Sequence, residues 1–410
     1  MTGIMKKNIS FALIFWVALS ILTIASCRDY NEVDYNPNEK NDITFARQFD
    51  NIYYGILYKY PYWDIDTANI IGRHDYWRAK AEELDNMSSV DDEMLKMIYE
   101  NMYGTMLDHH MDILVKNLRT NYGFITVNPG LNEVKKRSDY EASLINSNHI
   151  NKVIDEMVCY NRVTEKCKRI EEGKSLSLMS CLIDGDILYL YFNDFSLSDY
   201  LGKNSTEDEV KVNMVIDNYL NIISTRQDLK GVIIDVRNNS GGNARDLETV
   251  LGSLIDSPRL LGFSRQKNGM GMYDFSPFGE IFINPHERHL LNKKAVVVGL
   301  CDMGSVSCAE ETSAFIKDLP NGYLIGKRTF GATCPLSNLS EIEHTGTFGS
   351  FLGDHYVYLP AYLILFGEKR ILYEGVGVAP NETVPFDANL FEEKREDNQL
   401  NAAIDYIHKN

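Results

Sequence analysis

The sequence predicts an α/β protein with a largely parallel sheet, preceded by a helical N-terminal region. Two continuous apolar segments, Gly231–Val236 and Lys294–Leu300, have the length and composition of strands that are buried on both faces. Helical patterns over 207–224 and 308–318 alternate with them. Buried strands separated by helices are typical of a parallel sheet that is covered by helices.

The composition is ordinary for a soluble globular protein, with 44% hydrophobic and 24% charged residues among 410. This length is enough for one large domain or two ordinary ones. With 41 basic and 58 acidic residues, the formal net charge is −17. Because such an acidic chain repels nucleic acid and anionic lipid, we expect neither as a partner.

The N-terminus has the pattern of a secretory signal peptide. The basic pair Lys6-Lys7 precedes an apolar run over 9–24, which ends in Ile24-Ala25-Ser26-Cys27. This order predicts a signal peptide over residues 1–26, and its end resembles the lipobox at which bacterial lipoproteins are cleaved and acylated on cysteine. A transmembrane anchor is the alternative, although the run is a little short for one.

Lipid on Cys27 would hold the protein in the cell envelope, at a membrane, on a polar tether over residues 27–42. An oxidising compartment outside the cytoplasm would permit disulfides. None of the other cysteines has C-x-x-C spacing, so we expect no structural zinc site. These cysteines are Cys159, Cys167, Cys181, Cys301, Cys308 and Cys334.

The region 43–170 is predicted to be mainly helical. Apolar residues between Phe45 and Leu57 recur at spacings of three and four. A second predicted helix over Asp91–Leu107 has methionines near one face, which indicates core packing rather than cofactor contacts. Residues 121–146 are polar and irregular, and a helical pattern returns over 147–170.

The predicted α/β core covers 171–390. It begins with a hairpin, in which strands Leu176–Ile183 and Ile187–Phe192 flank the turn Asp184-Gly185-Asp186. The remaining predicted elements are a helix over about 244–255, strands over 259–265, 271–276, 322–325, 356–365 and 371–373, and a C-terminal helix over 391–410.

The turn after the first buried strand, Asp235–Asn243, is a candidate for holding developing negative charge. Its polar residues are followed by Gly241-Gly242 and then by a helix. Glycines allow a sharp turn and a close approach of the backbone, and N–H groups at a helix start are free to donate. The pattern suits an oxyanion hole, and an ordinary glycine turn is the alternative.

The turn after the second buried strand, Asp302–Glu311, carries Ser307 directly before a helix. A serine there projects from the carboxyl edge of the sheet, where α/β proteins place their sites. The N–H group of Cys308 could help to hold an oxyanion, so Ser307 is a candidate nucleophile. Helix capping is the alternative, because Ser307-Cys308-Ala309-Glu310 has the Ser-x-x-Glu spacing of a capping box.

A serine nucleophile needs a base, and the candidates are His109 and His110, whose alternative is a pair of surface histidines. Glu374 could orient or polarise the site, and its alternative is an ordinary loop carboxylate. His286 and His289 form an H-x-x-H string without a carboxylate partner, which makes metal binding there a weak interpretation.

Four short motifs follow one another along the predicted core. They are an Asp-x-Arg-Asn-x-x-Gly-Gly string at Asp235–Gly242, Gly-Ser-x-Ser-x-x-Glu at Gly304–Glu310, Gly-x-x-Thr-Phe-Gly at Gly326–Gly331, and Glu-Gly-x-Gly-Val-x-Pro at Glu374–Pro380. Together they resemble the tail-specific, C-terminal processing and tricorn-core family of serine peptidases. The resemblance is clear over about 186–386.

This resemblance implies a crotonase-like (ClpP/crotonase) α/β core and a serine peptidase that needs no metal or cofactor. One branch of the family uses a lysine about 25 residues after the serine, but that position is Ala332 here. The tricorn-like branch uses an upstream histidine, which implies Ser307 as nucleophile, His110 as base and Glu374 as supporting acid. The string Asp108-His109-His110 departs from the Asp-Gly-His of that branch, since a histidine replaces the small residue.

The resemblance further implies that the oxyanion is held by the amides of Gly241 or Gly242 and of Cys308. Many members carry a PDZ domain before the core. The segment between His110 and Asp186 lacks an evident PDZ glycine loop, so we predict no PDZ domain here.

The predicted function is therefore that of a serine-type endopeptidase or C-terminal processing peptidase that acts on exported polypeptides. The alternative is a catalytically inactive cell-envelope lipoprotein that binds peptides or glycans in the same cleft, because the lysine is missing and the Asp-His-His string is altered. A crotonase-fold acyl-CoA enzyme is a third interpretation, and it conflicts with export away from the cytoplasmic CoA pool.

Overall fold

The computed structural model describes residues 43–120, 123–164, 168–169, 176–337 and 344–410. The predicted signal peptide, the lipidation residue Cys27 and the tether lie outside these described residues, as does Cys167. No helix within the described ranges is both long and apolar enough to cross a membrane.

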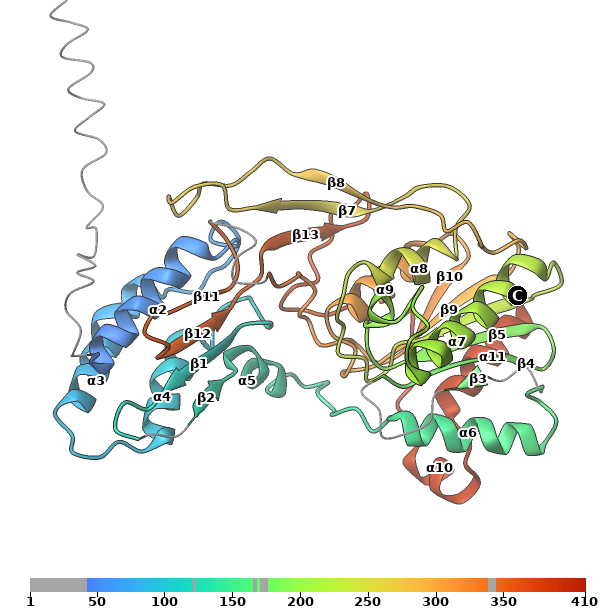
Figure 1. Ribbon diagram of the computed structural model, residues 1–410, viewed down its shortest axis with the longest axis horizontal. Coiled ribbons are helices and arrows are strands. Elements are labelled where there is room, and N and C mark those ends of the chain that lie inside the picture. The colour runs from blue at the N-terminus through green and yellow to red at the C-terminus, as the bar shows by residue number, and fades with distance from the viewer. Residues whose placement is uncertain (1–42, 121–122, 165–167, 170–175, 338–343) are drawn as a thin grey trace, which may run out of the picture. The chain divides into compact units, whose positions relative to one another are not determined.

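The N-terminal part of the described chain combines helices with an antiparallel sheet of order β11-β12-β1-β2. β1 pairs with β12, with Asp112 opposite Tyr358, so the sheet joins segments far apart in sequence. Figure 1 shows α2 and α4 beside this sheet, in agreement with their packing on β12 and β2. The elements are α2 (Phe45–Lys59), η1 (Ile71–Arg73), α3 (His74–Asp85), α4 (Asp92–Tyr103), β1 (Asp112–Lys116), β2 (Phe124–Val127), α5 (Pro129–Lys135), β11 (Phe348–Gly349) and β12 (His355–Tyr358).

The prediction of a mainly helical region over 43–170 is wrong between 112 and 127. Two strands form there, and Ile113 and Val115 are buried while their neighbours along β1 are half-buried. An alternation over five residues is too short to separate a strand from a helix by periodicity alone. Besides β2, β1 pairs with β12, which follows β10 and is therefore far away in the sequence.

The prediction of a largely parallel α/β sheet is confirmed. In the described chain a seven-stranded sheet has the order β14-β10-β9-β6-β5-β4-β3, and neighbouring strands from β14 to β5 are parallel. β4 and β3 complete it in antiparallel fashion, and the predicted hairpin joins β4 to β5. The strands are β3 (Lys168–Arg169), β4 (Leu178–Ile183), β5 (Ile187–Phe192), β6 (Gly231–Asp235), β9 (Val296–Cys301), β10 (Gly322–Gly326) and β14 (Glu382–Thr383).

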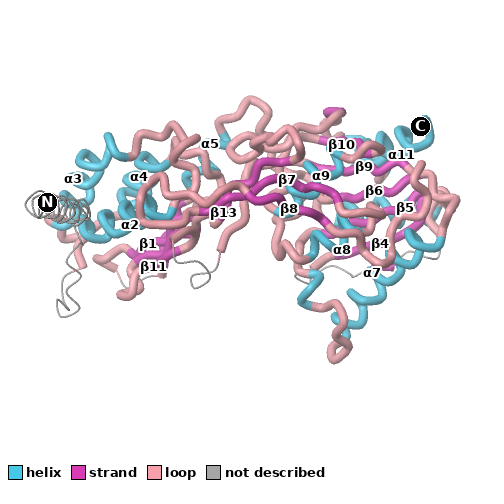
Figure 2. The backbone as a smooth tube through the Cα atoms, turned by 90° about the horizontal axis from the view of Figure 1, so that it is seen from above, coloured by secondary structure: helices cyan, strands magenta, loops and turns pink. Residues whose placement is uncertain are grey.

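Helices cover both faces of this sheet. Val232 and Ile234 of β6 lie in the cluster that contains the apolar residues of α7, α8 and α9, whereas Ile233 lies in the cluster formed with α6, α10 and α11. Figure 2 shows the strands side by side with helices around them. The helices are α6 (Ser147–Cys159), η2 (Leu197–Asp199), α7 (Glu207–Thr225), α8 (Asp246–Gly252), α9 (Cys308–Asp318), α10 (Ala388–Lys394) and α11 (Asn398–Lys409).

A further antiparallel sheet has the order β13-β7-β8, from β7 (Arg259–Gln266), β8 (Gly279–Ile283) and β13 (Tyr362–Phe366). The strand predicted over 271–276 is wrong, because Gly271 and Asp274 close a turn there. The single strand predicted over 356–365 is divided between β12 and β13, with Pro360 between them.

The other corrections concern the end of the chain. The segment 371–373 makes only an isolated bridge, between Ile371 and Phe366. The predicted C-terminal helix over 391–410 is two helices: α10 ends at Lys394, its C-cap Arg395 has φ 56°, and the Asp397 side chain then caps α11. A side-chain cap after a left-handed residue separates two helices that periodicity alone would join.

Candidate active site

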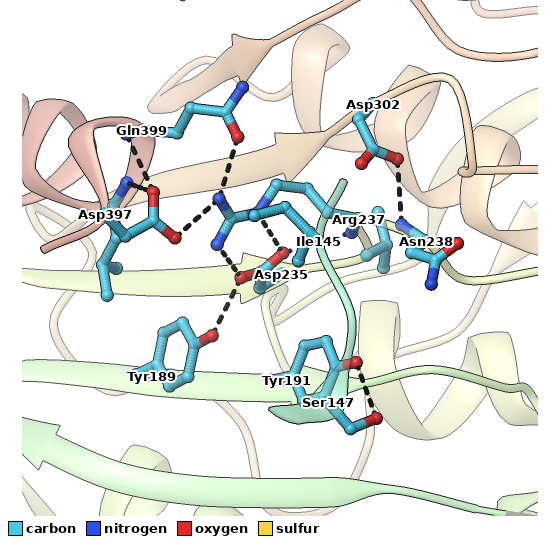
Figure 3. Close-up of polar contacts among 12 residues, drawn as sticks. Ile145, Ser147, Tyr189, Tyr191, Asp235, Arg237, Asn238, Asp302, Asp397 and Gln399 are labelled. Atoms are coloured by element: carbon cyan, nitrogen blue, oxygen red, sulfur yellow. Dashed lines mark hydrogen bonds and ion pairs between the residues drawn. The ribbon is translucent and has the colours of Figure 1, made fainter. Parts of the chain in front are cut away.

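The turn that follows β6 is fixed by a buried arginine. Arg237 donates to both carboxylate oxygens of Asp235, at 2.9 and 2.6 Å, and its Nη1 lies 2.8 Å from Asp397 Oδ2. Nη1 also donates to Gln399 Oε1, and the Tyr189 hydroxyl donates to Asp235 Oδ2, both at 2.8 Å. Figure 3 shows Arg237 between Asp235 and the start of α11. These buried charges therefore hold the end of β6 and α11 in one arrangement.

Gly241 brings this turn against the turn that carries Ser307. Its φ is 87°, and a Cβ at Gly241 would lie 2.6 Å from Ser307 Cβ and 2.8 Å from the Val306 carbonyl oxygen. The Asn239 side chain fixes the turn, because it donates to the Phe192 carbonyl and accepts from the Gly241 N–H, both at 2.8 Å. Only glycine satisfies both the left-handed φ and the close approach.

Ser307 occupies a sharp turn between β9 and α9, with φ 58° and ψ −122°. This conformation is strained for a residue other than glycine and costs on the order of 1–3 kcal/mol. The Glu310 N–H donates to the Ser307 carbonyl at 2.7 Å, and Glu310 Oε2 accepts from the Ser307 N–H at 3.4 Å. The helix-capping interpretation and the nucleophile-turn interpretation thus describe the same turn, in which Glu310 supports the strained serine.

The Glu310 carboxylate is fully buried and also organises the loop after β10. Its Oε1 accepts from Thr329 Oγ1 at 2.5 Å and from the Gly331 N–H at 2.7 Å, and its Oε2 accepts from the Ala332 N–H at 2.7 Å. Burial raises the pKa of Glu310 to about 8, although these hydrogen bonds oppose the shift. From its sequence context Glu310 was predicted only to cap the helix, because the Ser-x-x-Glu spacing does not reveal this distant loop.

Two backbone N–H groups beside Ser307 are open to a ligand. Neither Gly242 N–H nor Cys308 N–H has an acceptor among the described residues. The Cys308 thiol donates to the Gly242 carbonyl at 3.3 Å, so the two residues are neighbours. The N–H of Gly241 is engaged by Asn239, so Gly242 is the better placed of the two glycines to donate to a ligand.

The two candidate histidines lie on the loop between α4 and β1. Asp108 Oδ1 accepts from the His110 N–H at 2.7 Å, and Glu374 Oε1 accepts from the His109 N–H at 3.2 Å. The other oxygen of Glu374 accepts from the consecutive N–H groups of 333–334, at 2.8 and 2.9 Å. Glu374 therefore joins the histidine loop to the loop after β10.

Within the described chain, Glu374 accepts hydrogen bonds from backbone N–H groups and from the Thr333 hydroxyl, and none from the His110 imidazole. Burial raises the pKa of Glu374 to about 7. Burial, and then the neighbouring Glu374, raise the pKa of Asp108 well above its usual range. Two buried carboxyls near one another cannot both ionise at low cost, which is why both pKa values lie above their usual range.

His110 and Ser307 line one cavity of about 700 Å³, together with Gly242 and Cys308. Burial lowers the pKa of His110 to about 4, so its imidazole is neutral at pH 7 and can accept a proton. The structure thus brings the serine, one histidine and both open N–H groups to the same cavity. Of the predicted site residues, Glu374 and Gly241 do not line this cavity.

His109 differs from His110 in its surroundings. Its ring lies edge-on to Phe330, with the ring centroids 6.2 Å apart, and it is not among the described residues that line the cavity. Burial lowers the pKa of His109 to about 4 as well. The sequence left the choice between the two histidines open. The lining of the cavity favours His110.

Four residues that line this cavity were not predicted from the sequence: Ala244, Arg245, Pro335 and Leu336. The first two immediately precede α8, and the other two follow the loop that Glu310 and Glu374 hold. No motif marks them, because each reaches the cavity through a loop.

Comparison with known families finds a match for the part of the chain that contains most of the α/β core. Residues 186–382 match the model of peptidase family S41. This part of the chain, a little under half of it, is similar to peptidase family S41. The S41 match includes Ser307, both glycines and Glu374, whereas His110 lies before it.

Solved structures with a similar fold extend the comparison over most of the chain. A protein proposed to be a peptidase, from Parabacteroides merdae ATCC 43184, aligns with a TM-score of 0.60 at 18% identity, over 89% of this chain and 97% of that one. Mature CPAF complexed with lactacystin aligns with a TM-score of 0.54 at 13% identity, over 89% and 97%. At these identities the likeness shows the fold. No curated protein sequence matches the chain.

Proposed function

We propose that this protein is a serine peptidase in which Ser307 is the nucleophile and His110 is the base. One observation carries the proposal: a serine in a strained turn at the start of α9 and a neutral histidine from a remote loop line the same cavity. Strain in a serine at a strand-to-helix turn is typical of nucleophiles whose hydroxyl must be exposed.

The proposed reaction is acyl transfer. Ser307 Oγ attacks a peptide carbonyl carbon while the His110 imidazole takes the hydroxyl proton. The N–H groups of Gly242 and Cys308 stabilise the oxyanion. Collapse of this tetrahedral intermediate breaks the C–N bond, and the His110 proton passes to the leaving amine. Water, deprotonated by His110, then hydrolyses the acyl-enzyme and regenerates Ser307.

Glu374 has a positioning role in this proposal. Its carboxylate connects the backbone of His109 to the backbone of 333–334, which sets the place of the histidine loop. The supporting acid of the site therefore acts through the backbone rather than through a contact with the imidazole.

The protein is further proposed to be an exported lipoprotein, anchored through Cys27 in the cell envelope, with exported polypeptides as substrates. Support comes from the signal-peptide pattern over 1–26 and its terminal cysteine. Metabolic labelling with a fatty acid should mark the wild-type protein and not the Cys27→Ser variant. Labelling of that variant to the same extent would contradict the anchor.

Active-site labelling tests the peptidase proposal. A fluorophosphonate probe should label the wild type, and Ser307→Ala should abolish labelling and reduce hydrolysis of unfolded casein by about 10³-fold or more. The Ser305→Ala variant, in which a buried neighbouring hydroxyl is removed, should still be labelled. Labelling that persists in Ser307→Ala would exclude Ser307, and a wild type that is neither labelled nor active would favour the alternative of a binding lipoprotein.

His110→Ala should lose most of the hydrolysis, whereas His109→Ala should keep it to a greater extent, because only His110 lines the cavity. Equal activity of His110→Ala and the wild type would exclude His110 as the base.

A further inference from the structure

The cavity shared by Ser307 and His110 has one fixed charge on its walls. Among the described residues that line it, Arg245 is the cation and none carries a carboxylate. Its other walls are small, polar or apolar and include Ala244, Pro335 and Leu336. The chain as a whole has a net charge of −17, so a lone arginine in this place is a local exception.

The Arg245 side chain is exposed to solvent. Its backbone N–H donates to Asn243 Oδ1 at 3.0 Å, but its guanidinium makes no hydrogen bond or ion pair within the described chain. The adjacent carboxylate does not neutralise it, because Asp246 is buried and accepts from the N–H groups of Leu197 and Ser198, at 2.6 and 2.8 Å.

A guanidinium in this setting suits a carboxylate ligand. Its planar fork of N–H donors matches a carboxylate in bidentate geometry, and such charge-assisted bonds are stronger than neutral ones. An exposed ion pair contributes little, but a peptide that fills the cavity excludes water around the pair and strengthens the attraction. In an acidic protein, this cation also offsets the repulsion that an anionic segment meets on approach.

We propose that Arg245 is a specificity-determining residue that binds a carboxylate of the peptide substrate, either the side chain of Asp or Glu or the C-terminal carboxylate of the chain. Pro335 and Leu336 accommodate an adjacent apolar side chain. This inference rests on the proposed peptidase function, because it assigns the ligand of the same cavity.

Binding to the Ser307→Ala protein tests the inference without catalysis. Three pools of fluorescein-labelled octapeptides, built from Ala, Leu, Ser and Gly, provide the probes for fluorescence anisotropy. The first has one internal Glu and an amidated C-terminus, the second has Gln in place of Glu and an amidated C-terminus, and the third has that Gln and a free C-terminal carboxylate. Tighter binding of the first pool assigns a side-chain carboxylate, and tighter binding of the third assigns the C-terminal one.

Arg245→Gln in the same background should weaken binding of the preferred carboxylate pool by about tenfold and leave the second pool unchanged. Arg245→Glu should reverse the preference. A fourth pool, which has Lys in place of the internal Glu and an amidated C-terminus, should then bind more tightly than the Glu pool. Arg395→Gln is the control, since Arg395 is a half-buried arginine that does not line the cavity and pairs with Glu392 on α10, and it should change none of these values.

Equal affinity of wild-type Arg245 protein for all pools, or no binding of either carboxylate pool, would overturn the inference. An unchanged preference in Arg245→Gln would overturn it as well. These outcomes are separate from failure of the peptidase proposal, which is measured by labelling and hydrolysis in protein that retains Ser307.

Discussion

On one side of the cavity, Ser307 is held by the α/β core: the turn after β6 is fixed by the buried Arg237 and packs through Gly241 against the turn after β9. On the other side, His110 lies on a loop whose backbone N–H groups donate to the carboxyls of Asp108, Glu374 and Asp66. The first arrangement depends mainly on the ion pairs of Arg237 and on packing, and the buried Glu310, whose pKa is raised to about 8, also supports it. The second depends on the carboxyls of Asp108 and Glu374, whose raised pKa values make their charge sensitive to pH. Changes on the nucleophile side should therefore lower the stability of the whole fold. Changes on the histidine side should instead displace the loop that carries His110.

The largest expected effect is on the nucleophile side. Arg237→Met leaves Asp235 and Asp397 buried without their cation, and breaking a buried pair in this way costs about 3–5 kcal/mol. Urea denaturation should show this loss as a lower midpoint. Arg395→Met, which removes an exposed pair with Glu392, should cost less than about 1 kcal/mol. Equal losses in the two variants would mean that the buried network does not hold the core side.

Glu374→Gln tests the histidine side. The amide keeps the size of the carboxyl but can no longer accept at both oxygens, so the link between the histidine loop and 333–334 weakens. We expect kcat for a fluorogenic peptide to fall by about 10–100-fold with KM nearly unchanged, because positioning of the base affects the transition state. Thermal unfolding should change little. A large fall in Tm with kcat unchanged would mean that Glu374 stabilises the fold and does not position the base.

This difference also explains what the sequence could predict. The nucleophile side is built from strands and turns contiguous in sequence, such as Asp235–Gly242 and Gly304–Glu310, so its motifs and the parallel sheet were predictable. The histidine side depends on β1 pairing with β12 and on Glu374 reaching the backbone of His109, contacts between residues that local patterns do not connect. The strands β1 and β2 and the cavity residue Arg245 were missed for the same reason.

The pH dependence sharpens the comparison. Burial lowers the pKa of His110 to about 4 from 6.5, so its basic form is populated above that pH and the acid limb of kcat/KM should lie below about pH 5. For Glu374 the folded pKa is raised from 4.5 to about 7, so its contribution to holding the loop is complete below pH 4.5 and is lost as pH rises through about 7.

Hydrogen exchange at residues 108–110, corrected for intrinsic rates, should therefore become faster above pH 7 in the wild type. Glu374→Gln should lack this pH dependence, because the glutamine does not ionise. The buried strand β6 (Gly231–Asp235) serves as the internal control on the nucleophile side. An acid limb centred at pH 6.5, or protection of 108–110 that is constant with pH, would contradict the role given to burial.

The smallest expected effect concerns the strained serine itself. Ser307 has φ 58°, a conformation that costs a residue with a Cβ but not glycine, and the surrounding core holds it there through Glu310. Two inactive variants can isolate this cost. Ser307→Gly should be more stable than Ser307→Ala by about 1 kcal/mol in urea denaturation, since alanine keeps the strain while glycine relieves it. If the alanine variant is instead equally stable, the turn has relaxed without its hydroxyl, and the rigidity attributed to the nucleophile side would be a property of Ser307 rather than of the core that supports it.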